Sequence, residues 1–182
     1  MADFSIRRLM LDDLPHVRQL WRERWGGEFL VAHGVLYHPD ALEGFVALDG
    51  EKRLGLITYS FSDCGCEIVS IDSLCENMGI GTALVDKVIK AARQKKCKRV
   101  FLTTTNDNLR ALGFYQKRGF ELALLRRNAV NESRKIKPNL PLIGRHGIPL
   151  RDEIELELLL NTIHAADPHP SLRKGEGAGN VP

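Results

Sequence analysis

Short apolar stretches, some of them alternating with polar residues, predict strands along the chain. They are FSIRRL at 4–9, EIVSID at 67–72, KRVFLTT at 98–104, FELALLR at 120–126 and DEIELELLL at 152–160. Two further apolar runs between residues 45 and 61 are separated by Asp49 and Gly50, which is typical of a β-hairpin. We therefore expect one sheet of about six to seven strands.

Other stretches repeat apolar residues with the period of a helix. One helix is expected after LDDLP at 11–15, a second over 80–96 and a third over 108–118, ending at Gly119. Residues 24–44 mix glycine, aromatics and proline, which predicts an irregular or short-helical surface segment.

The order of these elements predicts a mixed sheet. The strand, helix and strand within 67–104 are long enough for a right-handed crossover between parallel strands, and the hairpins on either side give antiparallel neighbours. Residues 1–160 should form a single domain. Residues 161–182 are rich in proline, glycine and charge, so we expect a disordered tail.

Composition narrows the class of protein. The 182 residues are 43% apolar, and Lys plus Arg exceed Asp plus Glu by only 26 to 23. The basic run RQKKCKR at 93–99 carries no interleaved aromatics, so nucleic-acid binding is not expected. No apolar stretch approaches the roughly 20 residues that span a bilayer, and the first residues do not resemble a signal peptide, which favours a cytoplasmic protein without a membrane anchor. The four cysteines and six histidines lack metal-ligand spacing, so no metal is expected.

The stretch ENMGIG at 76–81 precedes the helix expected over 80–96. The start of a helix combines unpaired N–H groups with the positive end of its dipole, and glycine lets an anion approach the backbone. Gly79 and Gly81 therefore predict a phosphate site, to which the Thr82 hydroxyl could contribute. A plain tight turn is the alternative interpretation.

On the helix expected over 108–118, Asn108, Ala111 and Tyr115 fall on one face. This face could hold a ligand, although Tyr115 could equally be a core aromatic. Together, ENMGIGTALV and NDNLRALGFYQKRGFE resemble the two sequence motifs of the GNAT superfamily of acyl-CoA-dependent N-acyltransferases. The second motif is matched in full, by Asn108, Ala111, Phe114, Tyr115, Lys117, Gly119 and Phe120. In the first, Glu76 and Asn77 replace residues that the family usually has as Gln or Arg and as Gly.

The resemblance implies an α/β (α+β) fold with a mostly antiparallel sheet, a central splayed parallel pair and flanking helices. It also implies transfer of an acetyl group from acetyl-CoA directly to a primary amine, on a small molecule or a peptide. Backbone N–H groups would hold the diphosphate, and Glu76 would face solvent. The implied acetyl-CoA contacts are Ile71, Asp72, Ser73, Leu74, Asn77, Met78, Gly79, Ile80, Gly81, Thr82, Ala83, Asn108, Ala111 and Tyr115.

The chemistry needs a base for the acceptor ammonium, whose pKa is about 10, and an acid for the leaving thiolate. Tyr115 is the candidate acid. Glu67 and Asp72 are the candidate bases, with Glu67 preferred; strand alternation places them on opposite faces unless a β-bulge intervenes. Cys75 is a less favoured alternative, as a nucleophile.

Acceptor contacts are sought in the segments 21–44 and 127–152. Candidates are Trp21, Arg22, Trp25, Tyr37 and Arg145. Glu153, Glu155 and Glu157 form an acidic strand face that could attract an amine, but a solvated edge explains it more simply. A non-catalytic acyl-CoA sensor is the alternative function. The acceptor's identity, the length of the acyl group and a homodimer are left open.

Overall fold

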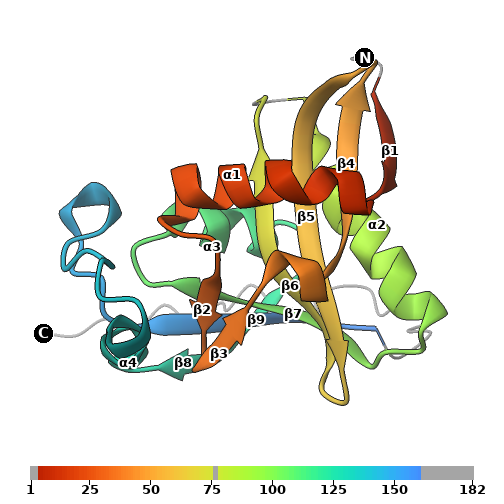
Figure 1. The fold of residues 1–182 in the computed structure, drawn as a ribbon. Helices are drawn as coiled ribbons and strands as arrows, with labels where there is room; N and C mark the ends of the chain where they lie inside the picture. Colours follow the sequence, from red (N-terminus) through yellow and green to blue (C-terminus); the bar gives the residue numbers. More distant parts are fainter. Residues whose placement is uncertain (1–3, 76–77, 161–182) are drawn as a thin grey trace, which may run out of the picture.

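A computed structural model of the chain describes residues 4–75 and 78–160. Seven strands form one sheet in the order β1-β4-β5-β6-β7-β9-β8, which confirms the expected mixed α/β architecture (Figure 1). The strands of this sheet are β1 Ser5–Arg8, β4 Glu43–Asp49, β5 Lys52–Ser62, β6 Gly65–Ser73, β7 Arg99–Thr105, β8 Glu121–Arg126 and β9 Glu153–Leu159. Of its pairs in the described ranges, only β6 with β7 is parallel.

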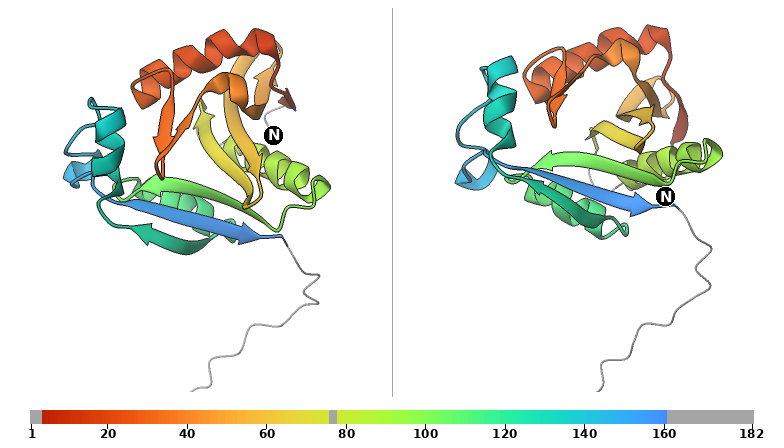
Figure 2. Two further views of the ribbon diagram at one scale, coloured as in Figure 1. Left: turned by 60° about the horizontal axis from the view of Figure 1, so that its bottom comes forward. Right: turned by 90° about the horizontal axis from the view of Figure 1, so that it is seen from below.

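The helices cover both faces of the sheet. Figure 2 shows α1 and a small hairpin, β2–β3, on one face, and α2 and α3 on the other. The helices are α1 Leu14–Trp25, α2 Ile80–Gln94, α3 Leu109–Gln116 and α4 Ala129–Ile136, with single 3-10 turns at Leu11–Asp13, Pro39–Ala41 and Arg145–Gly147. No helix in the described part of the chain is long and apolar enough to cross a membrane.

Residues 30–37 correct the expectation of an irregular segment at 24–44. They form the hairpin of β2 (Leu30–Ala32) and β3 (Val35–Tyr37). Its turn residues His33 and Gly34 both have positive φ, 41° and 81°, as a two-residue hairpin turn requires. Strands of three residues are too short to show a period of two, so the apolar pattern could not reveal them.

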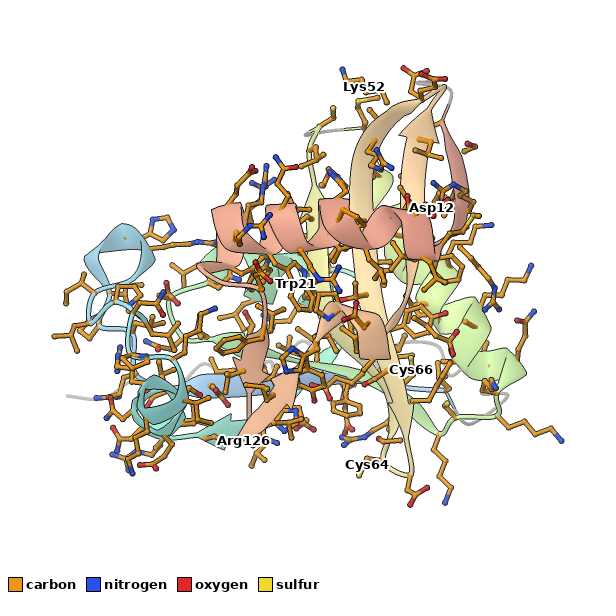
Figure 3. All side chains as sticks on the ribbon, viewed as in Figure 1. Asp12, Trp21, Lys52, Cys64, Cys66 and Arg126 are labelled. Carbon is orange, nitrogen blue, oxygen red and sulfur yellow. The ribbon has the colours of Figure 1, made fainter. Side chains whose placement is uncertain are left out.

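Each face of the sheet packs its own core. On one face, α2 buries Leu84, Val85 and Val88 against the central strands, as its helical period predicts. On the other, α1 buries Val17 and Trp21, and Figure 3 shows Trp21 between α1 and the sheet. Trp21 is fully buried, and its indole N–H donates to Ser70 Oγ at 3.2 Å, so this acceptor candidate is a core residue.

The acidic face of β9 is not a solvated edge, because β9 lies between β7 and β8. Glu155 is 5% exposed and accepts from Arg99 and Arg126. Glu153 is 3% exposed and accepts from the backbone N–H of His33 and the Ser133 hydroxyl. The expectation of a solvated strand edge was wrong, because alternation shows which residues share a face but not which strand lies beside them.

Candidate active site

A β-bulge in β6 determines which side chains meet at the site. Ile68 pairs with Tyr59 and Ser70 with Thr58 of β5, so Val69 is an extra residue without a partner in that strand. This shift turns Glu67 and Asp72 to the same face, toward the hairpin and α1 respectively, because it offsets the alternation between them. The sequence left open whether these two carboxylates lie on one face of the strand or on opposite faces, and the bulge places them on one face.

The parallel pair is short, and its strands then separate. Their pairing covers only Cys66–Ile68 of β6 and Val100–Leu102 of β7. Beyond that point the edge of β6 that faces β7 has no ladder partner among the described strands, while its other edge remains paired to β5 through Ser73. Backbone N–H and C=O groups along this edge are therefore available to a ligand.

A cavity of about 340 Å³, here called the β6–α3 cavity, lies at the separation. Its walls include two of the acceptor candidates, Trp25 and Arg145. They also include seven of the proposed acetyl-CoA contacts, namely Ile71, Asp72, Ser73, Gly81, Asn108, Ala111 and Tyr115. The proposed residues Leu74, Met78, Gly79, Ile80, Thr82 and Ala83 lie at the end of β6 and the start of α2, outside its walls. Glu76 and Asn77 fall outside the described residues.

The start of α2 has the features of an anion site. Gly79 precedes the helix with φ of 74°, and the Ala83 N–H donates to the Gly79 carbonyl at 3.0 Å. The N–H groups of residues 80–82 therefore have no acceptor within the helix. At Gly81 a β-carbon would lie 3.3 Å from the Phe114 ring, tighter than an ordinary contact, so glycine lets α2 and α3 approach closely here.

Arg118 places a positive charge beside this helix start, a position that is not evident from the sequence. Its guanidinium donates to Thr82 Oγ1 and to the Phe114 carbonyl, and it stacks 3.5 Å from the centre of the Phe114 ring. The basic residue is visible in the sequence, but its position depends on α3 packing beside α2.

Tyr115 is both a core aromatic and a wall of the β6–α3 cavity. The residue is 3% exposed, and its ring meets Phe114 and Phe120 edge-on at centroid distances of 5.0 and 5.2 Å. Burial raises the pKa of Tyr115, and the negative charge of Asp72 adds to this effect while Arg118 opposes it. The phenol is therefore protonated at neutral pH, as a proton donor must be.

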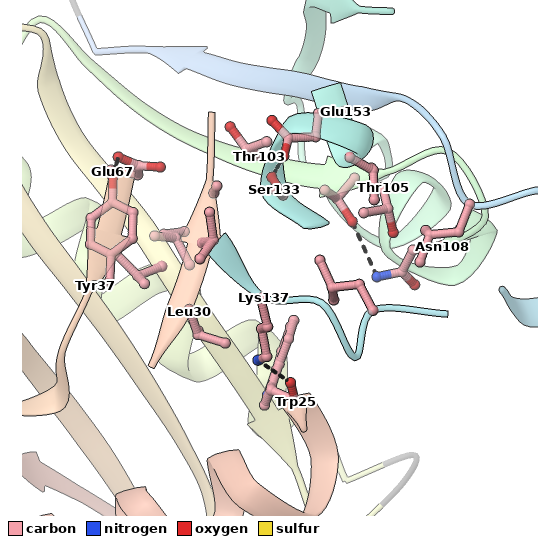
Figure 4. Close-up of a pocket in the computed structure, with 18 residues that line it drawn as sticks. Trp25, Leu30, Tyr37, Glu67, Thr103, Thr105, Asn108, Ser133, Lys137 and Glu153 are labelled. Atoms are coloured by element: carbon pink, nitrogen blue, oxygen red, sulfur yellow. Dashed lines mark hydrogen bonds between the residues drawn. The ribbon is translucent and has the colours of Figure 1, made fainter. Parts of the chain in front are cut away.

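A second cavity, of about 150 Å³, lies under the hairpin and is called the hairpin cavity (Figure 4). It shares walls with the β6–α3 cavity at the point where the two strands separate. The shared residues are Trp25, Ile68, Val69, Thr103, Thr104 and Asn108. A ligand bound in one cavity would thus lie next to a ligand bound in the other.

Glu67 lines the hairpin cavity and is held by the hairpin. The Tyr37 hydroxyl donates to Glu67 Oε2 at 2.7 Å, and His33 Nε2 lies 2.8 Å from Glu67 Oε1. The hydrogen bond with Glu67 raises the pKa of His33, against the opposing effect of burial. His33 is thus a partner of the candidate base, which only the fold of the hairpin reveals.

Asp72 lies on the other side of the separation, in the β6–α3 cavity. It is 5% exposed, accepts from the Trp25 indole at 3.1 Å and has Arg24 Nη1 at 3.9 Å. Burial raises the pKa of Asp72, and these partners oppose the rise. Of the other candidates, Arg22 is paired with Glu28 and lines neither cavity. The described residues contain no cluster that could hold a metal.

A parallel strand pair that separates beside a glycine-bounded helix start, with two adjoining cavities at the separation, is the arrangement expected of the acyltransferase class that the sequence motifs resemble. The chain belongs to the acetyltransferase (GNAT) family, whose model matches residues 7–120. Family membership makes it an acetyltransferase.

The chain is also similar in sequence to a Bacillus protein and in fold to solved acetyltransferase structures. Protein YxbD of Bacillus subtilis (strain 168) is 45% identical over 141 residues, which is 77% of this chain and 89% of YxbD. The IAA acetyltransferase from Bacillus cereus superimposes with a TM-score of 0.67 at 21% identity, over 87% of this chain and all of that one. A GNAT family acetyltransferase from Elizabethkingia anophelis, with acetyl-CoA bound, gives 0.64 at 24%, over 88% of this chain and all of that one.

Proposed function

We propose that the enzyme transfers the acetyl group of acetyl-CoA directly to a primary amine. The pantetheine arm would occupy the β6–α3 cavity and the amine the hairpin cavity. The observation that carries this proposal is the meeting of the two cavities at shared residues, with the acid Tyr115 in the wall of one and the base Glu67 in the wall of the other.

The residues around the β6–α3 cavity suit the donor. N–H groups of residues 80–82 and the Arg118 guanidinium can bind the diphosphate, since helix starts and arginines both favour anions. The unpaired edge of β6 from Ile71 to Ser73 offers backbone groups for the pantetheine amides. When bound, the thioester supplies the acetyl group and a thiolate leaving group.

Glu67 removes the proton that the acceptor ammonium must lose, directly or through one water. Neutral His33, protonated at Nδ1, then accepts this proton from Glu67 at Nε2 and releases its Nδ1 proton to solvent. The side-chain exposures fit this direction, because His33 is 19% exposed and Glu67 only 7%. The attacking nitrogen loses a second proton as the amide forms, and Glu67 passes it on by the same route. Tyr115 gives its phenolic proton to the thiolate and regains one from solvent, so each turnover releases one proton.

Asp72 is the weaker candidate for the base. It lines the β6–α3 cavity but not the hairpin cavity, so it faces the donor rather than the amine. Its negative charge near Tyr115 instead helps to keep that phenol protonated. Asp72 therefore acts by positioning and electrostatics, not as the group that takes the acceptor's proton.

The test measures thiol release from acetyl-CoA with a panel of primary amines, and coenzyme A binding by calorimetry. Tyr115→Phe should lower kcat by roughly 10²-fold or more, the usual contribution of a general acid, while coenzyme A affinity stays within about twofold. A protein that binds coenzyme A but acetylates no amine would contradict the proposal and revive the sensor alternative, which the paired acid and base do not favour.

A further inference from the structure

Two buried charges of opposite sign line the hairpin cavity without a charged partner. Glu153 is 3% exposed, and its carboxylate accepts only from the His33 backbone N–H at 2.8 Å and the Ser133 hydroxyl at 3.2 Å. Lys137 is 5% exposed, and its Nζ donates to the backbone carbonyls of Trp25 and Phe29. Neither side chain has an ion-pair partner within the described ranges.

Figure 4 shows Glu153 and Lys137 at opposite ends of the hairpin cavity. An uncompensated charge in a protein interior is costly, and both lie in the wall of one cavity. Burial lowers the pKa of Lys137, an effect that an anion beside its Nζ would reverse. A ligand with a cationic and an anionic end would compensate both charges at once.

The end of the cavity near Lys137 continues into a more open region. This outer cavity, of about 300 Å³, shares Lys137, Trp25 and Asn108 with the hairpin cavity and adds Arg24 and Arg145. Arg145 Nη1 donates to the neutral Asn108 amide oxygen at 2.6 Å. Asp107, also in the wall, is occupied by the Thr105 hydroxyl and the Arg145 backbone N–H. The charged side chains that line the outer cavity, into which the hairpin cavity continues, are therefore mainly cationic.

The acidic end has one more unused group. Thr103 Oγ1 is buried without a hydrogen-bond partner among the described residues, and Thr103 lines both the hairpin and the β6–α3 cavities. It lies across from Glu155 in the β7–β9 ladder, two pairs along from Thr105 and Glu153. An ammonium or amine there would find a hydroxyl acceptor next to the point where the thioester would lie.

We infer that the acceptor is a compact aminocarboxylate, whose amine is bound at the Glu153 end and whose carboxylate is bound by Lys137 and Arg145. This inference rests on the proposed function, because it names the substrate class of the same site. The remaining walls, including Leu30, Val31, Val130, Leu140 and Leu150, are apolar and suit an aliphatic body between the two ends. A phosphonate in place of the carboxylate would satisfy the same cations.

The experiment compares kcat/KM for matched acceptors with the native enzyme. The panel holds α-amino acids, ω-amino acids of increasing chain length, the alkylamines that lack only the carboxylate, and aminoalkylphosphonates. We expect at least one aminocarboxylate to exceed its decarboxylated match by about 10-fold or more, the factor that a hydrogen bond to a charged group provides. A phosphonate that exceeds every carboxylate would overturn the choice of carboxylate.

Two variants test the cationic end. Lys137→Met should erase the preference for aminocarboxylates over the matched alkylamines. Arg145→Gln, at an exposed residue, should reduce the same preference and does not disturb a buried side chain. The control is Lys135→Met, an exposed lysine on α4 that pairs with Glu132 and lines none of the three cavities.

Each failure has its own signature. If alkylamines are acetylated as fast as aminocarboxylates, the inference fails and the proposed function stands. If the variants instead raise KM for acetyl-CoA and leave acceptor preference unchanged, these cations serve the donor and the inference is overturned. If the native enzyme binds coenzyme A but acetylates nothing on the panel, the proposed function falls and the inference falls with it.

Discussion

Replacing His33 with glutamine should lower stability mainly at low pH and activity mainly at high pH. Glutamine can still donate a hydrogen bond to Glu67, but it carries no charge and relays no proton. His33 is faced by Glu67 of β6, Tyr37 of β3, Glu153 of β9 and Arg126 of β8. Glu67 is its closest charged partner, at 2.8 Å.

The sign of the stability effect follows from the raised pKa of His33. The stabilisation that charged His33 contributes is fully present below about pH 6.5, the pKa of histidine in the unfolded chain. It is lost as the pH rises through the higher pKa of His33 in the folded protein. A charged hydrogen bond exceeds a neutral one by about 1 kcal/mol. His33→Gln should therefore lower the melting temperature by about 2–4 °C below pH 6.5, a shift expected for about 1 kcal/mol in a domain of this size, and by less at pH 9.

The loss of activity should be largest at high pH, because only neutral His33 accepts the proton from Glu67. In the native enzyme kcat/KM should rise with pH through the raised pKa of His33. In His33→Gln that rise should be absent, and at pH 8 the rate should fall by roughly 10²-fold. The control is His38→Gln, an exposed histidine on the same segment. Identical pH profiles of rate for the native enzyme and His33→Gln would refute the proton route.

Two further predictions concern the donor side and the core. Arg118→Met should raise KM for acetyl-CoA by roughly 10-fold, since the charge beside α2 is lost. The control Lys117→Met, at an exposed neighbouring residue, should leave this KM unchanged. Equal KM values for the two variants would exclude a role for Arg118 in binding. Trp21→Phe should cost about 1–3 kcal/mol in urea unfolding, through lost packing and the lost bond to Ser70; an unchanged midpoint would contradict its place in the core.

The sequence predicted those parts of the fold whose pattern repeats over many residues. The helix over 80–96 corresponds to α2, and the face formed by Asn108, Ala111 and Tyr115 does line a cavity. The hairpin of β2 and β3 and helix α4 were not foreseen, since their apolar runs are too short or too irregular to show a period. The roles of the proposed site residues remain predictions.

The sequence alone could not predict contacts between residues that lie far apart in the chain. His33 meets Glu67 only because the hairpin folds over β6, and Lys137 reaches the end of α1 from the opposite end of the domain's sequence. Nothing local distinguishes these residues from ordinary surface histidines and lysines. The bulge at Val69 is equally hidden in EIVSID, because an extra residue in a strand is recognised only against its neighbour.

That additional residue makes the number of positions between Glu67 and Asp72 as important as the identity of the two acids. Deleting Val69 would restore strict alternation, and Asp72 would then rotate away from the Trp25 indole into the apolar layer under α2. A carboxylate there would have neither water nor a donor. Insertions and deletions within this strand should consequently harm the enzyme more than most single substitutions do, and engineered or natural variants should keep its length fixed.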